Sequence, residues 1–457
     1  MMDSGTGSRA YISAAKGCDA DGGLMAELGT KQNKKKLLLV SPMLHQGGFE
    51  RICVATARLL SPYFDVTTAI FDDADIAYDV TGLSIVNLNL PVKQGKIGKA
   101  VNLLRRIRAL KALKMRLGTD VTYSFGQTAN LVNCNARAND KVICGLRSYQ
   151  DFDNPEKIRM FCRKADLIAC CSREMEKQIR EDYGCDRTFT LYNPVRIPED
   201  AAGSGSGMQA ASAGNSKPGD TSIGLETPLW DDKEGLTQFL SKHGQLVMSM
   251  GREDDVKGFW HLIKAFSIVS GALTGKESGE VNDERAPGKD SGEGVAVERA
   301  PGLIIMGDGT FDEYRKLAQG LGIGEHVFFT GVMKKPFPLL KKASAYALTS
   351  SMEGFPNALV EAMALGVPAI ASDCMTGPAE IIHTKDGDAG VLLPVFSDHK
   401  DLDAGSIPEE DVRLADEILK ILKDPALATV LSAKGKIRAA DFSEEAYINN
   451  CLEFFKS

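Results

Sequence analysis

The sequence predicts an α/β protein with two doubly wound parallel sheets, and three observations carry this prediction. At 457 residues the chain is too long for one ordinary core, and two domains are expected. From Lys36 onward, short apolar runs alternate with helix-length segments, which is typical of parallel α/β layers. The alternation occurs in two series separated by Asn193-Pro194, where proline forbids helix continuation, so a hinge is expected there.

Each series consists of apolar segments of strand length. In the first series, a Gly47-Gly48 turn and a helix from about Phe49 to Leu60 follow the first strand. The strands expected in the first series are Leu37–Ser41, Val66–Phe71, Ile85–Leu90, Val121–Phe125, Val142–Leu146, Leu167–Cys171 and Phe189–Tyr192. Those expected in the second are Leu246–Met250, Leu303–Met306, Val327–Thr330, Tyr346–Thr349, Ala369–Ser372 and Val391–Pro394.

These series define the predicted domain division. Residues 1–35 form a disordered tail, 36–193 an N-terminal domain, 194–440 a C-terminal domain, and 441–457 a last helix that returns to the N-terminal domain. Two polar insertions, at about 200–224 and 273–302, are expected to be mobile loops because they contain too little apolar surface to order themselves. The second insertion contains Glu-Arg-Ala-Pro-Gly twice, which favours a duplicated loop over a functional unit.

Composition narrows the class of protein further. The net charge of −7 argues against a general nucleic-acid binder, because phosphate contacts need a surplus of basic residues. Ten cysteines without a Cys-x-x-Cys spacing fit a reducing compartment and suggest no zinc site. The first 35 residues lack the apolar core of a signal peptide, and no run approaches 18 apolar residues. A cytoplasmic location is expected.

The most informative segment is 349–368, which reads as strand, turn, helix and strand. Pro356 suits the first turn of a helix, and Gly366 suits its left-handed stop. Glu353 therefore lies on the loop after a strand, at the carboxyl edge of the sheet where open α/β folds bind ligands. Glu361 lies on the following helix, whose N-terminus suits an anionic ligand. A plain structural role, a loop carboxylate and a solvated helix residue, is the alternative for the two glutamates.

Two further motifs follow first strands. Gly47-Gly48 follows the first strand of the N-terminal series, where glycine lets the backbone approach a phosphate closely. Gly251-Arg252 and Lys257-Gly258 follow the first strand of the second series. Two fixed cations there are suited to a ligand of negative charge, and the alternative is a solvated Arg and Lys beside Glu253, Asp254 and Asp255.

Together these motifs resemble the retaining glycosyltransferases of family 4, which have the GT-B fold: two facing Rossmann-like domains with a cleft between them. Residues 349–368 resemble the family's E-x7-E motif, and Gly47-Gly48-Phe-Glu-Arg51 its first glycine loop. Asn193-Pro194 and the element Asp373 to Ile382 also fit, the latter like bacterial polysaccharide and lipopolysaccharide transferases. Gly307-Asp308-Gly309 and Thr330-Gly331 are further landmarks. The resemblance covers about 36–457 apart from the insertions.

The resemblance implies a reaction and a set of site residues. A hexosyl or N-acetylhexosaminyl unit would pass from a nucleotide diphosphate sugar, a UDP-sugar by preference, to a hydroxyl of a lipid-linked or polysaccharide acceptor in cell-surface glycan synthesis. The implied catalytic residues are Glu353, Arg252 and Lys257. The implied donor-binding residues are Gly48, Gly354, Phe355, Pro356, Asn357 and Glu361, and the acceptor-binding residues are Gly47 and Arg147. No cofactor and no metal are expected, because the cations replace a divalent ion and no Asp-x-Asp motif has a suitable strand context.

Three other classes compete with this interpretation. A GDP-mannose-dependent mannosyltransferase differs only in the donor. A non-catalytic nucleotide-binding protein of the same fold should have lost at least one charged motif residue. All four are present, namely Arg252, Lys257, Glu353 and Glu361. A nicotinamide oxidoreductase should show G-x-G-x-x-G after a strand, which the loop from His45 to Glu50 lacks.

A basic segment at 92–119 predicts one more partner. It contains nine Lys or Arg and no acid, with leucines and Ile107 at helical spacing among them. Such a basic amphipathic helix can lie on an anionic membrane surface, so a peripheral position on the inner face of the cell membrane is expected. An ordinary helix with a solvated basic face is the alternative.

Overall fold

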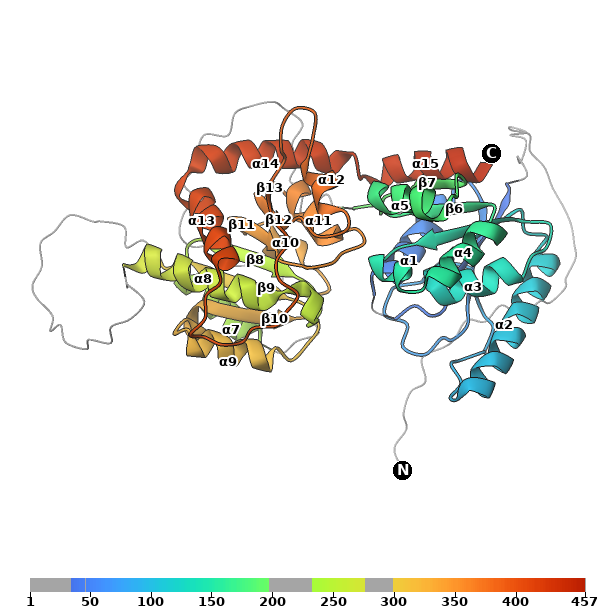
Figure 1. The fold of residues 1–457 in the computed structure, drawn as a ribbon, viewed down its shortest axis with the longest axis horizontal. Coiled ribbons are helices and arrows are strands. Elements are labelled where there is room, and N and C mark those ends of the chain that lie inside the picture. The colour runs from blue at the N-terminus through green and yellow to red at the C-terminus, as the bar shows by residue number, and fades with distance from the viewer. Residues whose placement is uncertain (1–33, 46, 197–231, 276–298, 457) are drawn as a thin grey trace, which may run out of the picture. The chain divides into compact units, whose positions relative to one another are not determined.

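The computed structural model describes residues 34–45, 47–196, 232–275 and 299–456. The predicted N-terminal tail and both predicted insertions fall almost entirely outside these residues. The described chain from Lys35 onward forms one compact unit that contains two parallel sheets, drawn in Figure 1 with their helices.

The first sheet has seven strands in the order β3-β2-β1-β4-β5-β6-β7, and neighbouring strands are parallel. Its strands are β1 (Lys36–Ser41), β2 (Asp65–Ile70), β3 (Ile85–Asn87), β4 (Val121–Phe125), β5 (Lys141–Leu146), β6 (Leu167–Cys170) and β7 (Thr188–Thr190). Its helices are α1 (Gly48–Leu60), α2 (Lys96–Leu117), α3 (Gly126–Asn135), α4 (Pro155–Lys164) and α5 (Arg173–Tyr183), with a 3₁₀ turn at Tyr149–Asp153.

Alternate residues of β1 explain why this sheet is covered on both faces. Leu37 and Leu39 pack into one apolar cluster with residues of α1, and Leu38 and Val40 pack into another with residues of α2 and α3. Because both faces are buried, the strand reads as a continuous apolar run.

The second sheet has six strands in the order β10-β9-β8-β11-β12-β13, again parallel throughout. Its strands are β8 (Leu246–Met250), β9 (Gly302–Met306), β10 (Val327–Gly331), β11 (Ala345–Leu348), β12 (Ala369–Ser372) and β13 (Val391–Leu393). Its helices are α7 (Lys233–Lys242), α8 (Phe259–Thr274), α9 (Asp312–Gly320), α10 (Phe337–Leu340), α11 (Asn357–Ala364), α12 (Pro378–Ile382), α13 (Glu409–Lys423) and α14 (Pro425–Ala440), with 3₁₀ turns at Asp255–Lys257 and Gly324–His326.

The last helix, α15 (Glu444–Lys456), packs on the first sheet although it follows the second in sequence. The Tyr447 hydroxyl lies 2.6 Å from Thr56 Oγ1 of α1, and the Phe455 ring lies 5.3 Å from the Tyr123 ring of β4. The chain thus passes between the sheets twice, once after β7 and once before α15. The two connecting segments are hydrogen-bonded to each other, because the Val195 N–H donates to the Phe442 carbonyl at 2.9 Å. The division at residues 193 and 441 remains a prediction.

All thirteen predicted strands have a counterpart, with ends displaced by up to three residues. The largest difference is β3, which ends at Asn87 where a strand to Leu90 was expected. Within the described residues, no helix combines the length and apolar character needed to cross a bilayer.

Candidate functional site

Most predicted site residues follow strands at the two points where strand order reverses, whereas Arg147 follows β5 and Glu361 lies on α11. In the first sheet β1 has β2 on one side and β4 on the other, and in the second β8 lies between β9 and β11. Connections leave such neighbours in opposite directions, so a crevice opens beyond their carboxyl ends and ligands bind there. The glycine turn follows β1, the two predicted cations follow β8, and Glu353 follows β11.

Lys257 and Glu353 form the central ion pair of this region. Lys257 Nζ donates to Glu353 Oε1 at 2.6 Å, and the Ser350 hydroxyl donates to the same oxygen at 2.7 Å. The side chains are 21% and 11% exposed, so the pair is largely shielded from water. Two of the residues predicted to be catalytic are therefore in direct contact, and each neutralises the other.

The position of Lys257 depends on the glycine that follows it. Gly258 has a φ of +59°, and a Cβ there would lie 2.5 Å from the Thr349 carbonyl oxygen. The Thr349 hydroxyl donates to the Lys257 carbonyl at 2.9 Å, which ties the turn after β8 to the end of β11. A side chain at position 258 would separate these segments and move Lys257 away from Glu353.

Arg252 lies apart from this pair. Its side chain is 67% exposed, and its guanidinium lies 3.7 Å from the Asp254 carboxylate, an ion pair open to solvent. The role predicted for Arg252 at a diphosphate is untested, and its exposure leaves the guanidinium accessible to a ligand.

The segment 373–377 holds Glu353 from the other side. The Glu353 N–H donates to the Met375 carbonyl at 2.9 Å, and the Thr376 N–H donates to the Glu353 carbonyl at 2.9 Å. The Thr376 hydroxyl adds a bond to the Gly354 carbonyl, also at 2.9 Å. This segment belongs to the Asp373–Ile382 element singled out from the sequence, and it fixes the backbone of the predicted hexose-binding loop.

Glu361 is buried on α11, with 2% of its side chain exposed. Its carboxylate accepts a hydrogen bond from the Arg51 guanidinium of α1, which is itself 43% exposed. The two residues belong to helices of different sheets. The alternative, that Glu361 is a solvated helix residue, is wrong because its side chain is buried. A buried acid requires a charged partner, and Arg51 supplies it.

The Gly47-Gly48 turn is held by a residue that the sequence did not single out. The Tyr78 hydroxyl donates to the Gly47 carbonyl at 2.6 Å and accepts from the Gly47 N–H at 2.9 Å. Gly48 begins α1, and a Cβ there would meet no atom within 4 Å. The first turn of α1 is thus fixed while Gly48 remains open to a ligand.

Glu50 lies beside this turn in an unusual state for a carboxylate. It is 7% exposed, and its Oε2 has no hydrogen-bond partner. Burial raises the pKa of Glu50, against the charges of His45 and Arg252, which favour ionisation. Glu50 belongs to the glycine motif identified in the sequence. Its burial could not be predicted from that motif, because it results from the packing of α1.

The loop from Gly354 to Asn357 supplies packing as well as predicted donor contacts. A Cβ on Gly354 would lie 2.5 Å from the Arg147 carbonyl oxygen, so the loop after β5 approaches this glycine closely. Phe355 is 5% exposed, and its ring lies 5.5 Å from the Tyr192 ring. Pro356 is the N-cap of α11, one position earlier than expected, and the buried Asn357 Oδ1 lacks a partner.

Arg147, the predicted acceptor residue, has a buried side chain. It donates to the Leu191 carbonyl at 2.8 Å, to Asn193 Oδ1 at 3.0 Å, and to the Tyr123 hydroxyl. These bonds join β5 to the end of the first series, which is a structural role. Arg147 is only 7% exposed, which leaves little of it open to an acceptor. Acceptor contact by Arg147 remains a prediction.

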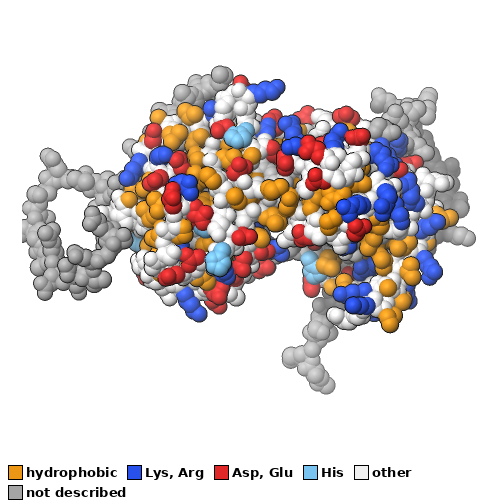
Figure 2. Space-filling model, in the orientation of Figure 1, with side chains coloured by type: hydrophobic (Ala, Val, Ile, Leu, Met, Phe, Trp, Pro, Cys, Tyr) orange, Lys and Arg blue, Asp and Glu red, His pale blue; other side chains and the backbone are white. Residues whose placement is uncertain are grey.

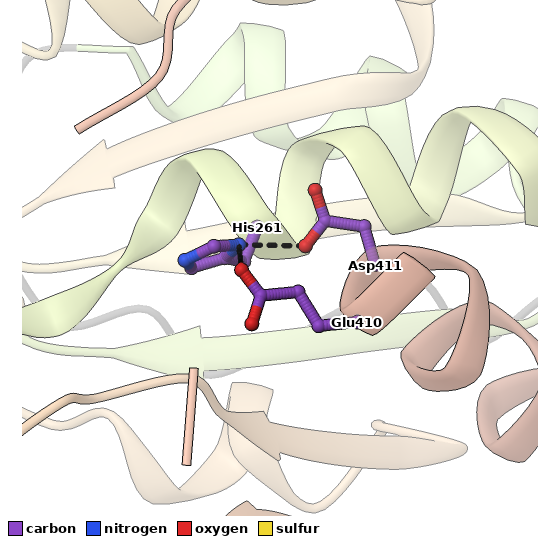
Figure 3. A group of neighbouring side chains, drawn as sticks. All are labelled: His261, Glu410 and Asp411. Carbon is purple, nitrogen blue, oxygen red and sulfur yellow. Dashed lines mark hydrogen bonds and ion pairs between the residues drawn. The ribbon is translucent and has the colours of Figure 1, made fainter. Parts of the chain in front are cut away.

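One group of side chains in the described residues has the composition of a metal site, namely His261 of α8 with Glu410 and Asp411 of α13 (Figure 3). His261 Nδ1 lies 2.6 Å from Asp411 Oδ1 and 3.6 Å from Glu410 Oε1, while Nε2 faces the Ser397 carbonyl at 3.0 Å. The 2.6 Å separation is a hydrogen-bond distance and is too short to hold an ion between the two atoms. Burial works against charge on the ring, but the facing acceptors outweigh it and the pKa of His261 is raised. The group is best described as a buried His261–Asp411 hydrogen bond that ties α8 to α13.

Comparison with known proteins finds similarity to glycosyltransferases. Residues 296–438 match the family model described as glycosyl transferases group 1. A glycosyltransferase of Methanocaldococcus jannaschii is 30% identical over 222 residues, 45% of this chain and 48% of the relative. The chain thus spans about half the length of that relative.

The matches that extend over nearly the whole chain include the following two. An N-acetylgalactosaminyltransferase of Campylobacter jejuni, named for a diphospho-undecaprenol-linked acceptor, is 21% identical over 437 residues, 92% of this chain and 99% of the relative. The crystal structure of Anabaena HepE in complex with UDP and glucose has a TM-score of 0.64 at 19% identity, covering 92% of this chain and 99% of that chain.

The fold prediction is confirmed, because the chain has the GT-B fold of its structural neighbours with two parallel α/β sheets. Residues 296–438 are similar to a group 1 glycosyltransferase domain, and this match together with the named relatives supports a transferase enzyme.

Proposed function

We propose that the chain is a retaining glycosyltransferase of family 4 that takes a hexosyl or N-acetylhexosaminyl unit from a nucleotide diphosphate sugar. The carrying observation is the set of charges at the carboxyl ends of β8 and β11: the Lys257–Glu353 pair and the buried Glu361. A structural ion pair does not need a glycine-dependent turn, a second buried acid and an exposed arginine around it. A site for a sugar diphosphate uses all of them.

Each residue has an expected role in this proposal. Lys257 and Arg252, with the Gly48 N–H, bind the diphosphate and stabilise its developing charge. Glu353 and the backbone from Gly354 to Asn357 bind the hexose, and Glu361 accepts bonds from the ribose hydroxyls.

The transfer step needs no protein base. The bond from the anomeric carbon to the diphosphate oxygen breaks, and the acceptor oxygen bonds to the same face of that carbon. The acceptor proton passes to the departing diphosphate. The configuration at the anomeric carbon is thereby retained.

A UDP-sugar is the proposed donor, and GDP-mannose is the alternative. The structural neighbour crystallised with UDP and glucose supports the first, and the relative named as an N-acetylgalactosaminyltransferase supports transfer of an N-acetylhexosaminyl unit. The proposed acceptor is a hydroxyl of a lipid-linked or polysaccharide glycan, in cell-surface glycan synthesis. We expect no metal to take part, because Arg252 and Lys257 are proposed to supply the positive charge that a divalent ion would otherwise provide.

Thermal unfolding with a panel of nucleotide sugars tests the donor. A ligand at 100 times its Kd stabilises the folded state by about 2.7 kcal/mol, which shifts the melting temperature measurably. We expect UDP-hexoses or UDP-N-acetylhexosamines to stabilise the protein more than free sugars do. Stabilisation by GDP-mannose alone would select the mannosyltransferase, and no response to any nucleotide sugar would refute the proposal.

The proposed partners include an anionic membrane surface, contacted through α2. Seven of the nine cations at 92–119 are exposed: Lys93, Lys96, Lys99, Arg105, Arg108, Lys111 and Arg116. Arg106 and Lys114 are buried instead, the first bound to the Leu90 carbonyl and the second to Asp140. Ile97, Leu104 and Met115 are apolar yet 82%, 54% and 68% exposed. Figure 2 shows basic and hydrophobic side chains intermixed where Figure 1 draws α2.

Vesicle co-sedimentation tests this contact. A basic residue near an anionic surface contributes about 1 kcal/mol, so about half of the seven suffice for reversible, salt-sensitive binding. We expect binding to anionic vesicles only, and its loss when Arg105, Arg108 and Lys111 are replaced by Glu. The same charge change at the exposed Arg159, Arg163 and Lys177 of α4 and α5 is the control. Equal loss in both triple variants would contradict a role for α2.

A further inference from the structure

The ribose-binding carboxylate proposed above already has a partner, the Arg51 guanidinium. We propose that Arg51 is a displaceable partner of Glu361, which the nucleoside hydroxyls must replace, so that Arg51 limits the affinity for the donor nucleotide. This inference rests on the proposed function and adds a residue that tunes it.

Burial of the two side chains is unequal, and this makes exchange possible. Glu361 is 2% exposed, whereas Arg51 is 43% exposed. A buried carboxylate without a partner is strongly disfavoured, so Glu361 needs Arg51 when no ligand is present. Arg51 already contacts solvent and loses little when its guanidinium moves fully into water. The acid thus stays in place while its partner is free to leave.

Arg51 is also mounted on the turn that the donor is proposed to contact. Its N–H donates to the Gly47 carbonyl at 3.2 Å, in the first turn of α1. The same peptide group is held by the Tyr78 hydroxyl. A ligand that reaches Gly48 and Glu361 together would therefore meet the Arg51 side chain between them.

The neighbouring acid shows the same arrangement. Glu353 is paired with Lys257 at 2.6 Å, so both acids of the site have a basic partner before any ligand arrives. Two neutral hydroxyls can satisfy a carboxylate by hydrogen bonds without its counter-ion. Exchange of Arg51 for the ribose is then close to balanced, and removal of Arg51 shifts the balance towards the nucleotide.

Nucleotide titration of Arg51→Gln by calorimetry tests the exchange, with UDP, GDP and the uncharged nucleosides uridine and guanosine as ligands. We expect the variant to bind its preferred nucleotide about 1.5- to fivefold more tightly than wild type, the range for a partly exposed ion pair. Loss of a cation alone would weaken binding of an anion, so tighter binding has the opposite sign from the general electrostatic effect. The uncharged nucleoside should gain at least as much as the diphosphate.

The control is Arg58→Gln, on the same helix, which removes an exposed pair with Asp79 at 3.2 Å and should leave affinity unchanged. Unchanged or weaker binding in Arg51→Gln would overturn the inference. Weaker binding of the diphosphate with unchanged nucleoside affinity would mean that Arg51 holds phosphate, which also overturns it.

A double-mutant cycle separates this inference from the proposed function. In ligand-free protein, the losses of thermal stability in Arg51→Gln and Glu361→Gln should be strongly non-additive in the double variant. Additive losses would show that the pair does not form and would overturn the inference. If the cycle shows coupling but wild type binds no nucleotide or nucleoside, the proposed function fails and the displacement fails with it.

Discussion

Replacement of Lys257 by Met should separate catalysis from folding. The substitution keeps the aliphatic chain and removes the cation that lies 2.6 Å from Glu353. The loss of one preorganised donor to a developing charge typically costs about 3–4 kcal/mol in the transition state, so kcat/KM should fall by about 10²–10³. Glu353 would keep the Ser350 hydroxyl as a partner, so the free energy of unfolding should fall by only about 1–3 kcal/mol.

The assay is steady-state release of nucleoside diphosphate, measured beside urea unfolding of the same preparations. Lys400→Met is the matched control, because Lys400 pairs at 3.0 Å with Asp255, which lies in the turn that ends at Lys257, and at 2.7 Å with Glu313, but has no role in the proposed site. The control should lose some stability and keep its turnover. If Lys257→Met retains near wild-type kcat/KM, or if the control loses as much activity, the diphosphate role of Lys257 is wrong.

Three further predictions address other parts of the molecule. Glu361→Ala should weaken calorimetric binding of the free nucleoside diphosphate, while Glu353→Ala should spare that binding and depress transfer; equal loss of affinity would refute the division of roles. Activity should survive excess chelator, and complete loss restored by Mg²⁺ or Mn²⁺ would point to a metal-dependent mechanism. The raised pKa of His261 means that its ion pair stabilises the folded state below the unfolded value of about 6.5 and is lost as pH rises through the folded pKa. The stability difference between wild type and His261→Gln in urea should therefore be largest at acid pH and shrink at alkaline pH, and a difference independent of pH would contradict a charged His261.

The sheets could be predicted from the sequence because the central strands, such as β1, β4, β9 and β12, are local runs buried on both faces. Val121–Phe125, Leu246–Met250 and Ala369–Ser372 match their predicted limits. Gly366 stops α11 with a φ of +78°, as its position indicated. Strand ends were less certain, since Leu88 to Leu90 are as apolar as the strand before them but continue as irregular chain.

The partners of the charged side chains could not be predicted in the same way. Arg51 and Glu361 lie 310 residues apart in sequence and meet only when both sheets have formed. Arg106 and Lys114 carry the same charge as their exposed neighbours on α2, and the bonds that bury them come from outside that helix. Tyr78, which holds the glycine turn, lies in a loop without a recognisable motif. Local patterns identify which residues are chemically suited to a site, whereas packing determines their neighbours.

A structure of the protein with its preferred nucleoside diphosphate would test the central claim most directly. We expect the ribose hydroxyls within hydrogen-bond distance of the Glu361 carboxylate, the diphosphate beside Lys257, and Arg51 withdrawn from Glu361. A nucleotide bound away from the carboxyl ends of β8 and β11, with the Lys257–Glu353 and Arg51–Glu361 pairs intact, would contradict the assignment of the site.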